Sequence, residues 1–251
     1  MRHLLARVAF VAALFAALTL CGIESFAAPG GDDGLLFALT ADKGFTADFA
    51  KGDPRPNFDD KTKIAVDPKT GPYIQSEGEQ VLSWHAASNI YAQRGTLSFN
   101  WRARTPLGGM QFPIFRVGYF DHTSWNMAWL RIDWNGHGID AFVTDDNLAR
   151  VRVSYRMDQF PAPDQWTNIA FSWDETKGIA LYIDGKLVAS KDQPAVLDSG
   201  LDQFGPFSRS ISPMQVQSGY QYVRGGDVDE IRIYDHMLEP ATISAIEAGQ
   251  P

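Results

Sequence analysis

Between residues 166 and 191, large apolar residues occupy every second position of two consecutive runs. The alternating residues are Ile169, Phe171, Trp173, Ile179, Leu181 and Ile183. This period of two is typical of a β-strand with one face in a core. A polar segment ending in Gly178 separates the runs, and Asp184-Gly185 follows the second; both are typical of hairpin turns. The pattern predicts consecutive antiparallel hairpins in a sheet with one buried face.

Similar patterns predict further strands along the chain. We expect them at 34–39, 95–102, 114–120, 150–156 and 228–234. Prolines and charges between 53 and 69 favour loops with short edge strands, whereas prolines and glycines between 193 and 226 favour long loops. A short helix is expected only at 240–246. No repeat or second core is evident, so we predict one all-β domain.

Three segments together resemble the laminin-G-like, concanavalin A-like jelly roll. They are WTNIAFSWD (166–174), LYIDGK (181–186) and VDEIRIYD (228–235), in this order and spacing. The resemblance covers the chain from about Gly34 to its end and implies a two-sheet antiparallel β-sandwich. Lectins, carbohydrate-binding modules, lyases and hydrolases all use this fold, so the resemblance alone does not define the function.

The N-terminus has the features of a secretory signal peptide. A basic start precedes the apolar run Val8–Leu20, and Ser25-Phe26-Ala27 ends in a small-x-small pattern. A membrane anchor would need a longer apolar run. We therefore predict a signal peptide at 1–27, a flexible leader at 28–33 and a laminin-G-like domain at 34–251.

Charge and cysteine content narrow the environment and the partners. The formal net charge is −8, and removal of residues 1–27 makes it more negative by one. An acidic protein of this kind is poorly suited to nucleic acid or anionic membranes. Cys21 is the only cysteine, and the bulky Leu20 before it argues against a lipoprotein signal. We predict a periplasmic or extracellular protein that is stabilised by its core, without disulfides or membrane insertion.

The segment 121–146 contains most of the candidate ligand-binding residues. As a strand, it would place Ala128, Leu130, Ile132 and Trp134 on a core face and Met127, Trp129, Arg131 and Asp133 on an exposed face. A sugar stacks its C–H face on an aromatic ring and hydrogen-bonds to guanidinium, carboxylate and amide groups. We therefore predict a polysaccharide or glycan site formed by Trp125, Asn126, Trp129, Arg131, Asp133, His137 and Tyr155.

An alternative interpretation of these residues is that they are structural and bind no ligand. Trp129 could pack between the sheets, with Arg131 and Asp133 as an ordinary charge pair. If the site is correct, alanine at Trp129 should weaken glycan retention and leave the fold intact. The outward residues of 150–156 include three arginines, which could bind an acidic polysaccharide such as a uronate polymer or form a solvated face paired with nearby aspartates.

The resemblance also implies a calcium site. Many family members bind Ca²⁺ with an aspartate from an early loop and the aspartate of the late Asp-Glu pair, and the matching residues here are Asp48 and Asp229. The alternative is that these aspartates cap turns or bind loop amides.

Motifs for catalysis are weak. The paired carboxylates of jelly-roll glycosidases are absent around Asp133, and no spacing requires the histidines, tyrosines and arginines to form a lyase site. The sequence therefore favours a secreted carbohydrate-binding module. A polysaccharide lyase or glycoside hydrolase, or a protein-interaction module on the same fold, remain the alternatives.

Overall fold

The structure is a computed structural model, and it describes residues 33–60, 62–75, 81–109, 111–119, 128–206 and 226–248. All of these belong to one unit, Gly31–Pro251, which is distinct from Met1–Gly30. The predicted signal peptide lies outside the described residues, as do Trp125 and Asn126. No helix in the described ranges is long and apolar enough to cross a membrane.

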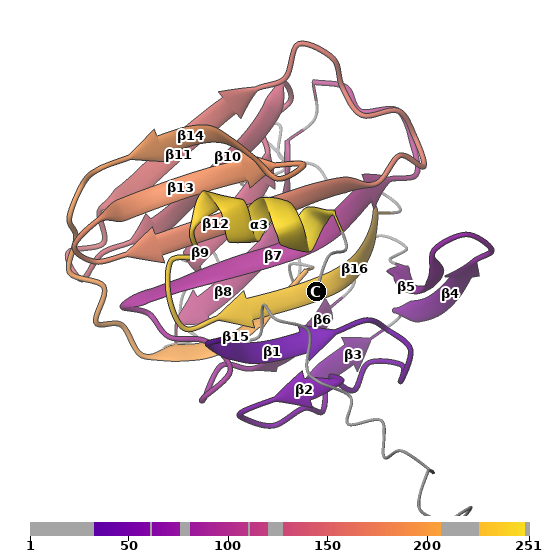
Figure 1. The fold of residues 1–251 in the computed structure, drawn as a ribbon, viewed down its shortest axis with the longest axis horizontal. Helices are drawn as coiled ribbons and strands as arrows, with labels where there is room; N and C mark the ends of the chain where they lie inside the picture. Colours follow the sequence, from indigo (N-terminus) through magenta and orange to yellow (C-terminus); the bar gives the residue numbers. More distant parts are fainter. Residues whose placement is uncertain are drawn as a thin grey trace, which may run out of the picture. The chain divides into compact units, whose positions relative to one another are not determined.

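The described strands form two antiparallel sheets, which Figure 1 labels. The nine-stranded sheet contains β1 (Leu35–Leu39), β2 (Phe49–Ala50), β4 (Lys63–Asp67), β5 (Gly71–Gln75), β7 (Arg94–Ala103), β12 (Thr167–Asp174), β13 (Gly178–Ile183), β14 (Lys186–Lys191) and β16 (Gly226–Tyr234). Its order is β14-β13-β12-β7-β16-β1-β2, and the hairpin β4–β5 joins it through β16.

The seven-stranded sheet carries the candidate site. It contains β3 (Phe58–Asp60), β6 (Val81–His85), β8 (Phe112–Tyr119), β9 (Ala128–Trp134), β10 (Gly138–Thr144), β11 (Arg150–Arg156) and β15 (Leu201–Gly205). Its order is β11-β10-β9-β8-β15-β6-β3. Strand β15 lies in a region for which the sequence predicts only loops.

The core lies between the sheets and is rich in aromatic rings. Phe99 of β7 stacks on Phe115 of β8 with ring centroids 5.1 Å apart. Trp129 of β9 meets Trp173 of β12 edge to face at 5.6 Å. Each pair joins one sheet to the other, so burial of these rings holds the layers together. The predicted two-sheet antiparallel β-sandwich is confirmed.

The turns predicted between 174 and 186 are confirmed. Gly178 has a φ of +100° and would clash as alanine, because an added Cβ would lie 2.1 Å from the Lys191 carbonyl oxygen. Asp184 and Gly185 have φ values of +48° and +69°, which is the paired positive φ of a type I′ hairpin.

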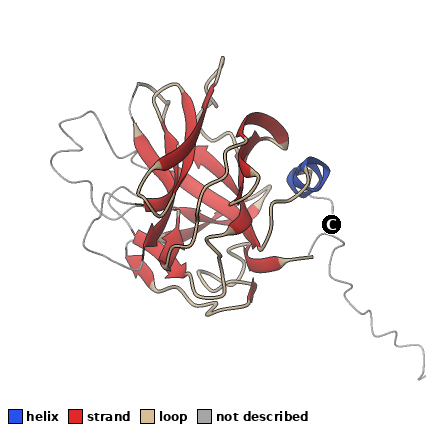
Figure 2. Ribbon diagram, turned by 90° about the vertical axis from the view of Figure 1, so that its left-hand side faces the viewer, coloured by secondary structure: helices blue, strands red, loops and turns tan. Residues whose placement is uncertain are grey.

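The helix α3 (Pro240–Glu247) covers part of the outer face of the nine-stranded sheet (Figures 1 and 2). Ile243 and the preceding Leu238 pack on the outward rings of Tyr182 and Tyr234. The Ser244 hydroxyl also donates a hydrogen bond of 2.7 Å to the Gly185 carbonyl oxygen. The apolar side chains on this outer face of the nine-stranded sheet are therefore covered by the helix and the segment before it.

Candidate functional site

Trp129 is buried in the core, so the prediction of an exposed Trp129 ring is wrong. Its exposed fraction is 0%. The cause is a bulge in β9: Leu130 pairs with Val117 while Ala128 pairs with Gly118, so Trp129 is an extra residue on its strand. The bulge breaks the alternation of faces and turns Trp129 to the same side as Leu130. A ring in this position cannot stack on a sugar.

Tyr155 faces away from the predicted site, whereas His137 lies in the turn that joins β9 and β10. Tyr155 lies opposite Ile139 in the β10–β11 pair and packs on the core, so it faces away from a ligand on the outer surface. His137 is exposed in the turn after β9, where its amide donates a 2.9 Å hydrogen bond to the Asn135 side chain. The prediction of Tyr155 as a ligand-binding residue is therefore corrected.

Arg131 and Asp133 are the predicted residues that the structure brings into contact. They point outward from β9, and the Arg131 Nε lies 2.9 Å from Oδ2 and 2.8 Å from Oδ1 of Asp133. Asp133 is only 6% exposed, so this charge-assisted contact is partly shielded from water. Arg131 and Asp133 therefore form the charge pair that the alternative interpretation expected. Other polar side chains lie next to this pair.

A row of outward side chains crosses four adjacent strands at this point. Arg116 of β8 lies opposite Arg131 of β9, Arg131 opposite Phe142 of β10, and Phe142 opposite Arg152 of β11. We call these four residues the arginine row. Because neighbouring strands are about 4.8 Å apart, the row brings the three guanidinium groups onto one continuous strip of the sheet.

Phe142 organises the arginines around it. Its ring is 0% exposed although it lies on the outer face of the sheet. The guanidinium carbons of Arg131, Arg150 and Arg152 lie 5.3, 4.4 and 5.1 Å from the ring centroid. These are cation–π contacts, and they hold the cationic groups over the sheet. Arg150 and Arg152 are exposed here, whereas the Arg131 side chain is only 12% exposed and the ring is covered.

Carboxylates alternate with the guanidinium groups on this face. Asp133 lies directly opposite Asp140 of β10, a pairing of like charges that is unfavourable by itself. Arg131 offsets it on one side, and the Arg152 Nη1 lies 3.4 Å from the Asp140 carboxylate on the other. The Asn135 amide also donates a 2.6 Å hydrogen bond to Asp140. Donors and acceptors for several hydroxyl groups are thus fixed on one surface.

Arg116 adds a second pairing of like charges. Burial lowers the pKa of the Arg116 guanidinium, and the facing charge of Arg131 lowers it further, while Asp202 opposes this shift. Two guanidinium groups held opposite each other favour a nearby anion, because an anion offsets their mutual repulsion.

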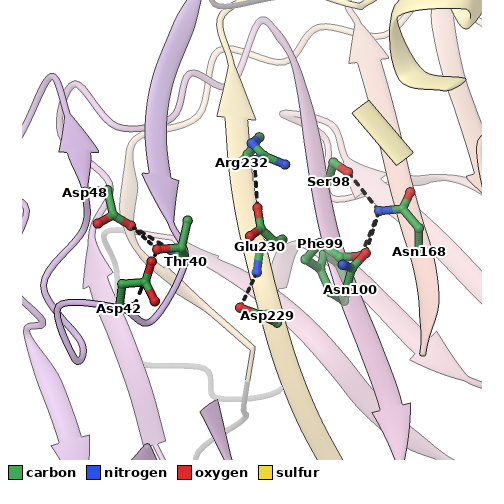
Figure 3. A network of polar contacts seen from close by, with 10 residues as sticks. All are labelled: Thr40, Asp42, Asp48, Ser98, Phe99, Asn100, Asn168, Asp229, Glu230 and Arg232. Atoms are coloured by element: carbon green, nitrogen blue, oxygen red, sulfur yellow. Dashed lines mark hydrogen bonds and ion pairs between the residues drawn. The ribbon is translucent and has the colours of Figure 1, made fainter. Parts of the chain in front are cut away.

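Figure 3 shows the predicted calcium ligands, which lie on the other sheet and its loops. Asp48 accepts hydrogen bonds of 2.7 and 2.8 Å from the amide and hydroxyl of Thr40. It also pairs with Lys43, with the Nζ 3.4 Å from Oδ1. These contacts fasten the loop between β1 and β2, in agreement with the alternative of a loop-bonding aspartate.

Asp229 has different surroundings. It is 6% exposed and accepts a 2.8 Å hydrogen bond from the Glu230 amide. Burial raises the pKa of Asp229 to about 7, and the charges of Glu230 and Asp42 contribute to the increase. Glu230 itself has a φ of +54° at a bulge in β16. A buried carboxylate with neighbouring acids is a group that a cation would stabilise.

Amide side chains extend this polar region across the nine-stranded sheet. Asp229 lies opposite Asn100, and Asn100 lies opposite Asn168. The Asn168 amide nitrogen donates a 2.9 Å hydrogen bond to the Asn100 oxygen. In the part of the chain that the structure describes, no three His, Cys, Asp or Glu side chains are grouped to hold a metal ion. Asp229 and the Asn100 amide opposite it place oxygen atoms of the type that a cation binds on neighbouring strands. The calcium site at Asp48 and Asp229 stays a prediction.

Comparison with known proteins supports the architecture. Residues 77–244 match the family described as the concanavalin A-like lectin/glucanases superfamily. A search of curated proteins finds no match.

Solved structures of botulinum neurotoxin domains are similar in fold. The receptor binding domain of the C/D mosaic serotype has a TM-score of 0.66 at 11% identity, with 88% of this chain and 52% of that chain covered. The type G receptor binding domain has a TM-score of 0.63 at 10% identity, with 87% and 52% covered. The serotype D ligand binding domain in complex with N-acetylneuraminic acid has a TM-score of 0.65 at 14% identity, with 87% and 52% covered. This chain therefore spans about half of each domain, and the likeness concerns the fold.

Proposed function

We propose, since this chain belongs to the concanavalin A-like lectin/glucanase superfamily, that it is a secreted carbohydrate-binding protein. Its glycan site is the outer face of the seven-stranded sheet around the arginine row. The observation that carries this proposal is the register that aligns Arg116, Arg131 and Arg152 beside Asp133 and Asp140. The signal-peptide pattern at 1–27 supports secretion, and a similar domain from a neurotoxin has been crystallised with a sugar, N-acetylneuraminic acid.

The chemistry of the face suits sugar hydroxyl groups. A hydroxyl can donate to the carboxylates of Asp133 or Asp140 and accept from a guanidinium, and the planar fork of arginine binds two oxygens at once. Strands rather than loops hold these groups, so little ordering is required when a ligand binds.

Binding rather than hydrolysis is favoured by the pairing of the acids. Asp133 and Asp140 face each other on neighbouring strands, and a glycosidase would need one of two such carboxyls to act as a proton donor. Each of them has a guanidinium partner, which favours the ionised carboxylate, so neither is arranged to donate a proton. A lyase or hydrolase would instead generate unsaturated products or new reducing ends from the polymers that the protein retains.

A glycan array with matched variants tests the proposal. Arg152→Ala is expected to weaken retention by about 10-fold or more, because a hydrogen bond to a charged group is lost. The Arg152 side chain is 40% exposed, so the fold should tolerate the change. Arg94→Ala, an exposed arginine on the other sheet, is the control and should bind like the wild type. Equal binding by both variants, or no retained glycan, would contradict the proposal.

We also propose that Ca²⁺ binds beside Asp229 and stabilises the neighbouring loops without contacting the glycan. The buried Asp229 carboxylate and its acidic neighbours support this placement, and Ca²⁺ prefers such oxygen ligands. Saturating Ca²⁺ should raise the Tm of the wild type by several degrees relative to a chelator, and the increase should vanish in Asp229→Asn. A wild-type Tm that does not respond to Ca²⁺ would refute the site.

A further inference from the structure

The outer face of the seven-stranded sheet has a local excess of positive charge. On the described part of this face the guanidinium groups belong to Arg116, Arg131, Arg150, Arg152 and Arg156. The carboxylates are Asp133 and Asp140, with Asp202 acting on Arg116. The chain as a whole has a net charge of −8, whereas the described charged side chains around the arginine row sum to a positive charge. A positive region on an acidic protein attracts anions and directs them to one place.

The ion pairs on this face leave room for an incoming anion. The contact of Arg152 with Asp140 is long, at 3.4 Å, and the Arg152 side chain is 40% exposed. Such partly solvated pairs contribute little stability. An anionic ligand can therefore bind Arg152 without the loss of a strong contact. Arg131, in contrast, keeps its close contact with Asp133 and helps to hold the row in place.

The direction of the row limits the shape of the ligand. Arg116 and Arg131 lie on adjacent strands, and Arg152 lies two strands further across the sheet. At a strand separation of about 4.8 Å, the guanidinium groups are spaced by one strand between Arg116 and Arg131 and by two strands between Arg131 and Arg152. Arg152 is the more exposed end of the row, with a side chain 40% exposed against 12% for Arg131. A chain that carries an acidic group on successive sugars would meet them in turn when it lies across the strands.

We infer that the glycan bound at the arginine row is acidic, with carboxylate or sulfate groups on its sugars, and that it crosses β8, β9, β10 and β11. This inference rests on the proposed function and adds the class of ligand. Guanidinium groups bind both oxyanions through paired hydrogen bonds. The carboxylate of Asp140, whose contact with Arg152 is long at 3.4 Å, can accept a hydrogen bond from a hydroxyl group of the same sugars.

The test uses matched acidic and neutral oligosaccharides in calorimetry with the full chain. The probes are hexasaccharides of galacturonate, alginate and chondroitin sulfate, with carboxyl-reduced or desulfated counterparts. At least one acidic probe should bind, and its neutral counterpart should bind about 10-fold or more weakly. Arg152→Gln should remove most of this preference, whereas Arg94→Gln should not change it. Which counterpart loses binding distinguishes carboxylate from sulfate.

The other outcomes separate this inference from the proposed function. Equal binding of an acidic probe and its neutral counterpart would overturn the acidic class and leave carbohydrate binding in place. Failure to bind any of these probes or any array glycan would overturn both. Binding of poly-glutamate as tight as that of the acidic sugars would show non-specific attraction of polyanions, which also overturns the inference.

Discussion

Replacement of Trp129 with alanine is expected to lower the free energy of unfolding by about 3–5 kcal/mol. The ring is fully buried and packs against Trp173 of the opposite sheet, so its loss creates a large cavity between the layers. Urea denaturation followed by circular dichroism measures the effect. This outcome is the opposite of the intact fold that an exposed Trp129 would give.

Trp129→Phe is the matched control for this measurement. Its aromatic ring refills most of the space, and the Trp129 Nε1 makes no hydrogen bond within the described residues that would be lost. The phenylalanine variant should therefore cost much less, about 1–2 kcal/mol. If the alanine variant kept full stability and lost glycan binding, Trp129 would be exposed in solution and the bulge in β9 would be wrong.

The second large effect concerns the pH dependence of stability at Asp229, measured in a chelator. Burial raises the pKa of this carboxyl to about 7 in the folded chain, from an ordinary value of 3.8. Between about pH 4 and pH 7 the folded state therefore holds a proton that the unfolded state releases, and stability falls as the pH rises through this range. A shift of this size corresponds to at most about 4 kcal/mol.

Asp229→Asn should remove that dependence, because asparagine resembles the neutral carboxyl. The difference in unfolding free energy between this variant and the wild type should shift in favour of the variant from pH 4 to pH 8. Asp48→Asn is the control: Asp48 is held by Thr40 and Lys43, so its replacement should destabilise the chain and produce no such gain. Parallel pH profiles for Asp229→Asn and the wild type would show that Asp229 titrates normally.

Much of the architecture could be predicted because alternation reports directly which face of a strand is buried. The strands around Phe171 and Ile231, the turn at Asp184-Gly185 and the terminal helix follow from local patterns. The prediction failed at Trp129, because one extra residue in β9 places its side chain on the same side of the sheet as Leu130. A bulge depends on pairing with another strand, and a single strand's pattern does not reveal it.

The candidate site was only partly predictable for a related reason. Arg131 and Asp133 were identified from their spacing on one strand, and Arg152 from the row of arginines in β11. Arg116 and Phe142 were missed. Each lies between two core residues of its strand, so the alternation of faces indicates that its side chain points outward, but it does not indicate a role in binding. Their importance comes from the register that aligns four strands, and this register is a property of the folded sheet.

A crystal structure of the protein with the tightest-binding array glycan would show directly whether the outer face of the seven-stranded sheet holds the sugar. We expect sugar oxygens within hydrogen-bonding distance of the Arg131 or Arg152 guanidinium, with at least one hydroxyl on Asp133 or Asp140. A glycan bound on the nine-stranded sheet or only at the loops, with the arginine row left to solvent, would contradict it.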